Sequence, residues 1–546
     1  MSEPEIDRAP SGELPEELSE ARPGETSKKP RRWRTLFHGG VAFPPKYRFR
    51  GFLTKLRGKQ FTLSPIQEEM LWAIARKTGT PYLSDPVFVE NFIGDFRRQL
   101  PKEFIDLTFQ EIDLSEIRRA QEEERAKREA MTLDEKKLLA KRRKADREKL
   151  RAAFGFAEVD GKTVERAGYV AEPAGLFMGR GAHPHRGKWK EQASEEEMIL
   201  NLGESAPVPP GKWKAIVHDH TSTWLASWTD RLSGKTKYLW LSDLSEIRQE
   251  NDIRKYDKAE LLAGKISKVR KEITKGLASR NIQTQKLALV AYLIDRLAMR
   301  VGDEKDKDEA DTVGASTLRA EHVKTDDKKM LFDFLGKDSV RWQKEITAET
   351  PEDSAALGYF RETLPKKKVG ELLFEGVTSS KVNEFLSSCA SGLSAKVFRT
   401  FHATRTVELF LLKAPAEKQA PEYEKVYWGK LANLEAAKVC NHKRTPPAGW
   451  EESLRKKEEK LKELEASGKE AEKIGKSKRE IELAISVRDY NLNTSLRNYI
   501  DPRVYAKWAR RVGVDARKIY PTSLQKKFSW LPEIKPAERK TGKKSN

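Results

Sequence analysis

One tyrosine near the C-terminal end of the chain stands among arginines. Tyr499 lies between Arg497 and Arg503, and Pro502 ends any helix through this stretch, because proline lacks the amide hydrogen and restricts the preceding residue. A phenol is a weak nucleophile at neutral pH, since its ordinary pKa is ~10. Nearby cations would favour the phenolate and neutralise an anionic substrate. A half-buried core tyrosine would give the same pattern, so a functional site needs further groups from elsewhere in the chain.

The composition indicates a folded protein with a basic surface. The 546 residues contain 105 Lys and Arg against 84 Asp and Glu, a formal net charge of +21 at pH 7, together with 12 Trp. This length allows several domains and a large core, and the charge favours an anionic polymer as partner. The two cysteines, Cys389 and Cys440, form no metal-ligand spacing and fit a reducing compartment. We expect no membrane segment, because no apolar run is long enough and the N-terminus lacks a signal-peptide core.

The N-terminal part begins with a segment rich in Glu, Pro, Ser and Gly. We expect residues 1–30 to be disordered and to lead into the basic cluster 28–32, which fits a nuclear-import signal. Residues 112–156 are heavily charged, and Thr132 with Glu135 forms a capping box. This pattern favours a solvated helix pair, while the basic run 141–144 leaves open a second interpretation, in which it meets phosphates.

A glycine-rich segment and a hairpin follow. Glycines flank Arg180 in residues 175–184, so the backbone there can approach a ligand closely, although no P-loop motif is present. The pairs His183/His185 and His218/His220 lack further ligands at useful spacing, and we predict no metal site. Residues 213–242 alternate apolar and polar around Gly234 and predict a β-hairpin.

The second half contains the elements that must position the chemistry. Residues 287–299 are apolar nearly all round and predict a buried helix, which Arg300 ends. Residues 331–335 and 340–342 predict two strands, with Lys337 at the tip of the hairpin between them. A helix that Ser394 can cap carries Lys396, Arg399 and Arg405, and a helix from about Tyr427 carries His442 near its end. The charged stretch 446–488, with Gly468 inside it, predicts a projecting two-helix arm that leads to Tyr499.

Together these elements supply one set of groups: Arg300, Lys337, Arg399, His442 and Tyr499. Cleavage of a phosphodiester by an oxygen nucleophile passes through a pentacovalent state with extra negative charge. Guanidinium groups match its non-bridging oxygens, an imidazole can donate a further hydrogen bond, and a lysine can protonate the departing oxygen. No metal is needed where such cations are preorganised.

The order and flanks of these residues resemble eukaryotic type IB DNA topoisomerases. The resemblance extends from about Trp33 to Trp530, and its motifs are long and specific. The matching segments are 297–300 (Leu-Ala-Met-Arg), 310–314 (Ala-Asp-Thr-Val-Gly), 332–339 (Phe-Asp-Phe-Leu-Gly-Lys-Asp-Ser), 395–400 (Ala-Lys-Val-Phe-Arg-Thr), 440–442 (Cys-Asn-His) and 498–503 (Asn-Tyr-Ile-Asp-Pro-Arg).

The resemblance implies an α+β fold: a two-lobed clamp around duplex DNA, with a mostly helical catalytic lobe of tyrosine-recombinase type, a helical linker and a small C-terminal domain. The expected divisions are a tail (1–30), core subdomain I (31–48 and 133–248), a cap (49–132), catalytic subdomain III (249–445), the linker (446–488) and the C-terminal domain (489–546).

The resemblance also implies the activity and its residues. Tyr499 would form a transient 3′-phosphotyrosyl link, Arg300, Lys337, Arg399 and His442 would complete the catalytic set, and supercoils would relax without ATP or an essential divalent cation. DNA contacts are expected at Arg180, His183, Asp338, Lys396 and Asn498, and contacts with camptothecin-type inhibitors at Arg180, Asp338 and Asn498. The expected partner is double-stranded DNA, the expected state a monomer, and the expected location the nucleus, with mitochondria also open.

Four departures and two alternatives accompany the resemblance. Met178 stands where the family usually has Arg, and Phe401-His402 replaces a Tyr-Asn pair; the tail and linker are short. A tyrosine recombinase or integrase would use the same active-site groups, but it would lack the extended cap and the projecting linker. A non-enzymatic basic DNA-binding scaffold would account for the charge and aromatics alone.

Overall fold

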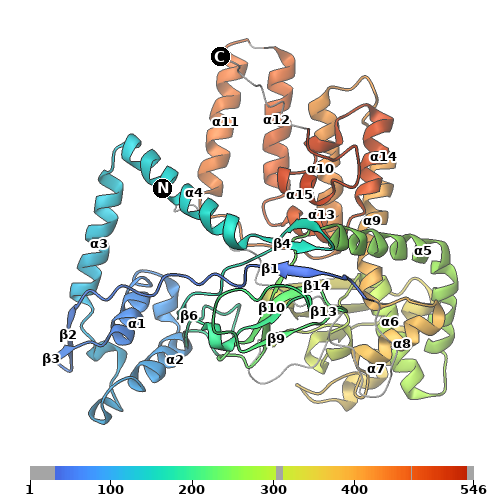
Figure 1. Cartoon of the computed structure of the whole chain (residues 1–546). Coiled ribbons are helices and arrows are strands. Elements are labelled where there is room, and N and C mark those ends of the chain that lie inside the picture. Colours follow the sequence, from blue (N-terminus) through green and yellow to red (C-terminus); the bar gives the residue numbers. More distant parts are fainter. Residues whose placement is uncertain (1–30, 303–310, 469, 538–546) are drawn as a thin grey trace. The chain divides into compact units, whose positions relative to one another are not determined.

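The computed structural model describes residues 31–302, 311–468 and 470–537, without the side chain of Asp338. Helices and strands are mixed, as expected for the α+β class. Contacts divide the chain into two compact units, one formed mainly by residues up to Arg248 and one mainly from Gln249 onward (Figure 1). The predicted disorder of residues 1–30 lies outside the described residues. The finer division into subdomains stays a prediction.

The first unit contains two small sheets and two short hairpins. The three-stranded antiparallel sheet has the order β1-β4-β5, and the four-stranded sheet has the order β11-β10-β8-β9 with β8 and β9 parallel. The strands are β1 (Leu36–His38), β2 (Leu53–Leu56), β3 (Lys59–Thr62), β4 (Phe156–Val159), β5 (Lys162–Glu165), β6 (Gly175–Leu176), β7 (Trp189–Lys190), β8 (Ile199–Asn201), β9 (Ala215–Val217), β10 (Trp224–Thr229) and β11 (Thr236–Trp240). The predicted hairpin around Gly234 is confirmed as β10 and β11.

Four helices belong to the same unit: α1 (Pro65–Ala75), α2 (Pro86–Arg97), α3 (Ser115–Ala130) and α4 (Leu133–Phe154). Helices α1 and α2 bury an apolar core that includes Met70, Phe88 and Phe92. The predicted charged helix pair is confirmed as α3 and α4, and α4 buries none of its residues. The Thr132 hydroxyl accepts from the Glu135 amide in the predicted capping box.

The second unit begins within the long helix α5 (Glu246–Leu277) and has two apolar cores. The first core lies among helices α5 to α9 and a three-stranded antiparallel sheet of order β12-β13-β14. Its elements are α6 (Ile282–Leu297), α7 (Pro351–Thr363), α8 (Ser379–Cys389), α9 (Ala395–Lys413), β12 (Val323–Thr325), β13 (Lys329–Gly336) and β14 (Val340–Thr347). Helix α6 is buried nearly all round, as its continuous apolar sequence predicts.

The second core joins α9 to the C-terminal helices. Its members include Val407, Ala436, Leu496, Tyr505 and Trp508. The elements are α10 (Glu422–Val439), α13 (Leu492–Asn498), α14 (Pro502–Val512) and α15 (Thr522–Lys527). The predicted arm is confirmed as α11 (Trp450–Ala466) and α12 (Ala471–Ser486), which run side by side (Figure 1).

Three local expectations are corrected by the structure. Helix α6 ends at Leu297, because Ala298 adopts a left-handed backbone, so Met299 and Arg300 lie on the following segment. Ser394 precedes α9 but its hydroxyl makes no cap hydrogen bond. Helix α10 starts at Glu422 rather than near Tyr427, since residues 422–426 continue the same helix after Pro421. No helix among the described residues is long and apolar enough to cross a membrane.

Candidate active site

Tyr499 lies at the junction between α13 and α14. It is the C-cap residue of α13, and Pro502 opens α14 at its first turn, where a missing amide hydrogen costs nothing. The junction is tied to α9, because the Thr404 hydroxyl donates to the Tyr499 carbonyl over 3.2 Å and accepts from the Asp501 amide over 3.1 Å. The phenol ring itself is half-buried, so the turn fixes a tyrosine that is not sealed into the core.

A second contact holds α13 against α10. The buried hydroxyl of Ser495 donates to the Asn433 side-chain oxygen over 2.9 Å, and the Asn433 amide donates to the Leu492 carbonyl over 3.1 Å. Neither residue was predicted to be part of the site. Both contacts join segments about sixty residues apart, so no local sequence signal could have revealed them.

Arg399 occupies the centre of the site. It points from α9 and is 4% exposed. Its Nη1 donates to the Ala298 carbonyl over 2.6 Å and its Nη2 to the Cys440 carbonyl over 2.8 Å. The guanidinium carbon lies 5.0 Å from the centroid of the Tyr499 ring. A permanent positive charge is therefore held against the phenol by two main-chain carbonyls.

His442 lies close to the same tyrosine and beside Arg399. It follows α10, and its ring centroid is 5.2 Å from that of Tyr499. The separation between its Nε2 and Arg399 Nη2 is 3.4 Å. An Nε2 that accepts from Arg399 leaves the ring proton on Nδ1, which is buried and has no hydrogen-bond partner in the described part of the chain. Buried polar atoms without a partner are uncommon in folded proteins, so this one favours a functional explanation.

Arg300 is placed by a close approach of two backbone segments. The Ala315 amide donates to the Arg300 carbonyl over 2.8 Å. Next to this bond, Gly302 has φ +88° and packs directly against Gly314, where a Cβ would lie only 2.4 Å from the Gly302 Cα. Both glycines are therefore required by space, and Gly302 also by its backbone conformation.

Lys337 lies at the exposed tip of the β13–β14 hairpin, as predicted. The hairpin is fastened beside the segments that carry Arg300 and His442. The Val313 amide donates to the Leu335 carbonyl over 2.8 Å, and the Asn441 side chain donates to the Arg341 carbonyl over 3.1 Å. The lysine is thus carried by a well-paired hairpin and is exposed at its turn.

Arg399 and Arg300 lower the pKa of both Tyr499 and His442, which favours the charged form of the phenol and the neutral form of the imidazole. Burial is the largest influence on Tyr499 and raises its pKa, but Arg399 and Arg300 outweigh it, so the pKa of the phenol is lowered overall. For His442 all three influences agree: burial first, then Arg399 and Arg300, lower its pKa from 6.5 to about 3. The site therefore combines a phenol biased towards phenolate with an imidazole that is neutral at pH 7.

The remaining predicted residues are distributed over both units. Asn498 is exposed at the end of α13, and Lys396 is exposed in the first turn of α9, so both flank the site. The side chain of Asp338 lies outside the described residues. Arg180 and His183 belong to the β6–β7 loop of the first unit, where Gly179 and Gly181 have φ +62° and +58°.

The structure shows the contacts of two residues that depart from the family pattern, Met178 and His402. The Met178 side chain packs against the apolar core of α1 and α2. His402 Nε2 lies 2.9 Å from a carboxylate oxygen of Asp295, which also receives two hydrogen bonds from Arg270. In the described residues, no group of three or more His, Cys, Asp or Glu side chains is arranged to hold a metal ion.

Comparison with known protein families assigns almost the whole described chain. Residues 31–241 match the model of the eukaryotic DNA topoisomerase I DNA binding fragment, residues 244–474 its catalytic core, and residues 471–538 the C-terminal topoisomerase domain. DNA topoisomerase 1 of Homo sapiens is 31% identical over 92% of this chain and 71% of its own length. The chain belongs to the eukaryotic DNA topoisomerase I family.

Other members of the topoisomerase I family match over a similar share of this chain. DNA topoisomerase 1 beta of Arabidopsis thaliana is 34% identical over 93% of this chain, and DNA topoisomerase 1 of Drosophila melanogaster is 34% identical over 91%. These matches cover 59% and 54% of the two relatives. The chain therefore spans less than two thirds of the length of these topoisomerase I family members.

Proposed function

We propose that this chain is a type IB DNA topoisomerase that relaxes positive and negative supercoils by transient cleavage of one strand. The observation that carries the proposal is the grouping around Tyr499: a phenol of lowered pKa, the buried guanidinium of Arg399, the charge of Arg300 and the neutral imidazole of His442. This is the set that an oxygen nucleophile needs at a phosphodiester. Membership of the topoisomerase I family supports the same activity.

The proposed cleavage is a transesterification. Tyr499 attacks the phosphorus as the phenolate, which Arg399 and Arg300 favour and whose proton has passed to solvent; a phosphotyrosyl bond forms to the 3′ side, and the bond to the 5′ oxygen breaks. Lys337 transfers a proton to that 5′ oxygen, which leaves as a hydroxyl. Arg300 and Arg399 bind the non-bridging oxygens, whose negative charge grows in the transition state.

Resealing follows the same path in reverse. The free 5′-hydroxyl attacks the phosphotyrosine after the cut strand has swivelled about the intact strand. One ester bond is exchanged for another in each direction, so the bond energy is conserved and no ATP is consumed. We propose accordingly that the enzyme needs neither a cofactor nor a divalent cation.

The neutral state of His442 suits its proposed role. An imidazole whose pKa is about 3 stays uncharged at pH 7, so it contributes a hydrogen bond and does not compete as the acid. That role falls to Lys337, whose exposed position at a hairpin tip lets its flexible side chain reach a leaving group. The assignment separates charge stabilisation from proton transfer.

The larger features of the proposal rest on the family. The two units would form a clamp around duplex DNA, with a catalytic lobe of tyrosine-recombinase type, acting as a monomer in the nucleus. Arg180, His183, Asp338, Lys396 and Asn498 would contact DNA. Arg180, Asp338 and Asn498 would also contact camptothecin-type inhibitors, which should increase the yield of covalent complex.

The decisive experiment replaces the nucleophile. Tyr499→Phe removes one oxygen, so folding and DNA affinity should survive while relaxation and covalent adduct disappear together. Relaxation of supercoiled plasmid is measured with EDTA and without ATP, and the adduct formed by the unmodified chain is trapped with denaturant and mapped to its peptide. Tyr505→Phe is the control, because that tyrosine is fully buried and donates to the Gly429 carbonyl over 2.9 Å.

Four outcomes would contradict the proposal. A DNA remnant on another tyrosine, or relaxation by Tyr499→Phe, would reject the nucleophile. Site-specific strand exchange without relaxation of unrelated plasmid would indicate a recombinase. DNA binding without any adduct would indicate a non-enzymatic scaffold.

A further inference from the structure

Two cations join the same two helix ends behind the proposed active site. Arg399 donates to the carbonyls of Ala298 and Cys440, just past the ends of α6 and α10. One residue earlier in each helix, the carbonyls of Leu297 and Val439 accept from the ammonium of Lys344, over 3.2 and 2.8 Å. The second connection comes from β14, an element that carries no predicted catalytic residue.

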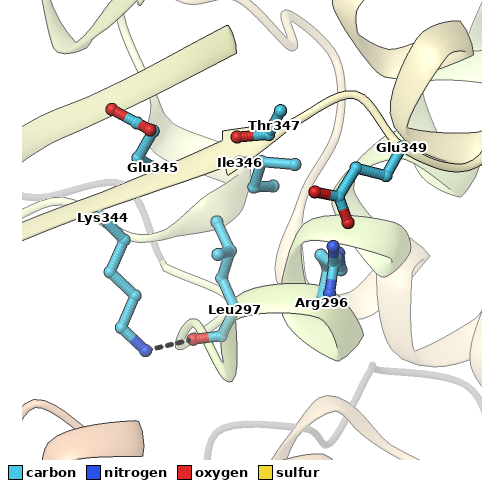
Figure 2. A pocket seen from close by; sticks show the side chains of 7 residues that line it. All are labelled: Arg296, Leu297, Lys344, Glu345, Ile346, Thr347 and Glu349. Carbon is cyan, nitrogen blue, oxygen red and sulfur yellow. Dashed lines mark hydrogen bonds between the residues drawn. The ribbon is translucent and has the colours of Figure 1, made fainter.

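Lys344 lies beside a cavity of about 370 Å³ at the end of α6. Figure 2 shows its side chain extending from β14 to the Leu297 carbonyl, while Glu345 and Glu349 project elsewhere along the cavity wall. Its ammonium is therefore committed to main-chain carbonyls. This distinguishes Lys344 from the ion-paired lysine on β13, Lys329, whose ammonium lies 2.8 Å from Glu345.

The two acceptors are the ones that a cation should prefer. The last carbonyls of a helix lack partners within it and carry the negative end of the helix dipole. Each helix end also leads into a left-handed residue, Ala298 with φ 52° and Asn441 with φ 54°. This conformation is costly for residues other than glycine and persists only where surrounding contacts impose it. Arg300 lies two positions after Ala298, and His442 lies one position after Asn441.

We propose that Lys344 is a positioning residue for DNA cleavage: its ammonium holds the ends of α6 and α10 together and so sets the spacing of Arg300 and His442 around the nucleophile. This inference rests on the proposed topoisomerase function. It does not place Lys344 in contact with DNA.

The proposal implies a pH dependence, because the lysine must be charged to bind both carbonyls strongly. Burial chiefly lowers the pKa of Lys344 from 10.5 to about 8; the Cys440 thiol opposes this shift, and Arg399 adds to it. The other charged groups that face the cavity are Arg296 from α6, Glu345 from β14 and Glu349 after it. The ammonium is then lost as the pH rises through about 8.

The effect on stability has the opposite sign to the effect on activity. Between pH 8 and 10.5 the unfolded chain holds a proton on Lys344 that the folded chain has released, so this group makes folding more favourable as the pH rises. If deprotonation of Lys344 slows cleavage in this pH range, unfolding therefore cannot be the cause. A role confined to stability would give no such loss.

The experiment compares Lys344→Met and Lys344→Arg with the unmodified chain. Single-turnover formation of covalent adduct is measured at saturating enzyme from pH 7 to 9.5, with DNA affinity measured in parallel. At pH 7, Lys344→Met should cleave about tenfold to a hundredfold more slowly, the range expected for misplaced catalytic groups, with an unchanged dissociation constant. Lys324→Met is the matched control, because it removes one exposed lysine from strand β12 of the same sheet, with β13 between it and β14.

Lys344→Arg supplies the second readout, and it keeps the inference testable if Lys344→Met fails to fold. Arginine stays charged throughout this range. The activity of Lys344→Arg divided by that of the unmodified chain should therefore increase as the pH is raised beyond 8. Other groups that titrate in both proteins cancel in this ratio. Parallel pH profiles, or full cleavage by Lys344→Met, would overturn the inference. Absence of adduct from the unmodified chain would instead overturn the proposed function.

Discussion

At the scale of single residues, the proposed chemistry separates the nucleophile from the acid. Tyr499 is half-buried among Arg399, Arg300 and His442, whereas Lys337 extends from an exposed turn. In the proposed cleavage the phenol would form the new ester, and the lysine would protonate the oxygen that departs. A substrate whose leaving group needs no proton should therefore make Lys337 dispensable, but not Tyr499.

We predict that Lys337→Ala slows cleavage of an ordinary DNA strand by about 10²-fold to 10⁴-fold, the usual contribution of a general acid. A substrate with sulfur at the 5′-bridging position has a leaving group that needs no proton, so it should be cleaved nearly as fast as by the unmodified chain. The measurement is single-turnover adduct formation on both substrates. Equal losses on the two would show that Lys337 acts in another way.

The depressed pKa of His442 gives a prediction for stability. Its pKa is about 3 in the folded chain and about 6.5 when unfolded, so the unfolded state binds the proton first as the pH falls. Stability from this group is complete above pH 6.5 and is lost towards pH 3, by up to ~1.4 kcal/mol per pH unit. The difference in unfolding free energy between the unmodified chain and His442→Gln should therefore shrink from pH 7.5 to pH 5.5, measured by urea denaturation. Parallel stability curves would refute this.

At the scale of elements, the site depends on the backbone contact between Gly302 and Gly314. This contact lies next to the Ala315–Arg300 hydrogen bond, and it brings together the two segments on either side of residues 303–310. A side chain at Gly314 would meet main-chain atoms, which cannot move aside as a flexible side chain can. The arginine segment would shift as a whole.

We predict that Gly314→Ala lowers both thermal stability and the rate of adduct formation, the rate by about 10²-fold if Arg300 moves by ~1 Å. Gly358→Ala is the control: this glycine lies in α7 with nothing within 4 Å of an added Cβ, so the change should stabilise the chain by up to ~1 kcal/mol. Melting curves and single-turnover assays on both variants provide the measurement. Wild-type cleavage by Gly314→Ala would show that the close contact does not position Arg300.

At the scale of the whole molecule, the excess of positive charge should govern the proposed DNA binding. The formal net charge is +21, and α4 presents its basic residues on a helix that buries none of them. Binding of this kind gains free energy by releasing counterions from DNA. It should therefore weaken strongly as salt is added, whatever the DNA sequence.

We predict that the logarithm of affinity falls with the logarithm of salt concentration at a slope of roughly −7, the value expected if binding neutralises about eight phosphates. Tyr499→Phe is used, so that binding is measured without covalent capture, and fluorescence anisotropy reports on a labelled duplex. Replacing Lys141 and Arg142 with Gln tests the contribution of α4 and should make the slope shallower by about one to two. A slope near zero for the parent protein would exclude this mode of binding.

The sequence alone was sufficient for the elements whose patterns are local and strong. Continuous apolar residues identified α6, a turn between apolar strands identified the β13–β14 hairpin with Lys337 at its tip, and charge with a capping box identified α3 and α4. The candidate residues came from motifs, because long ordered matches to a family carry information that periodicity lacks. Element ends were less certain, since the left-handed Ala298 that stops α6 has no sequence signature.

Only the tertiary structure could decide what surrounds those residues. The shifted pKa values of Tyr499 and His442 arise from burial and from the charges of Arg399 and Arg300, which lie on segments far from both residues in the sequence. The contacts of Thr404, Asn433 and Lys344 join elements that are distant in the chain, and they end on main-chain carbonyls or polar side chains that any sequence could supply. Such contacts depend on where the backbone passes, so they exist only once the two cores of the second unit have packed.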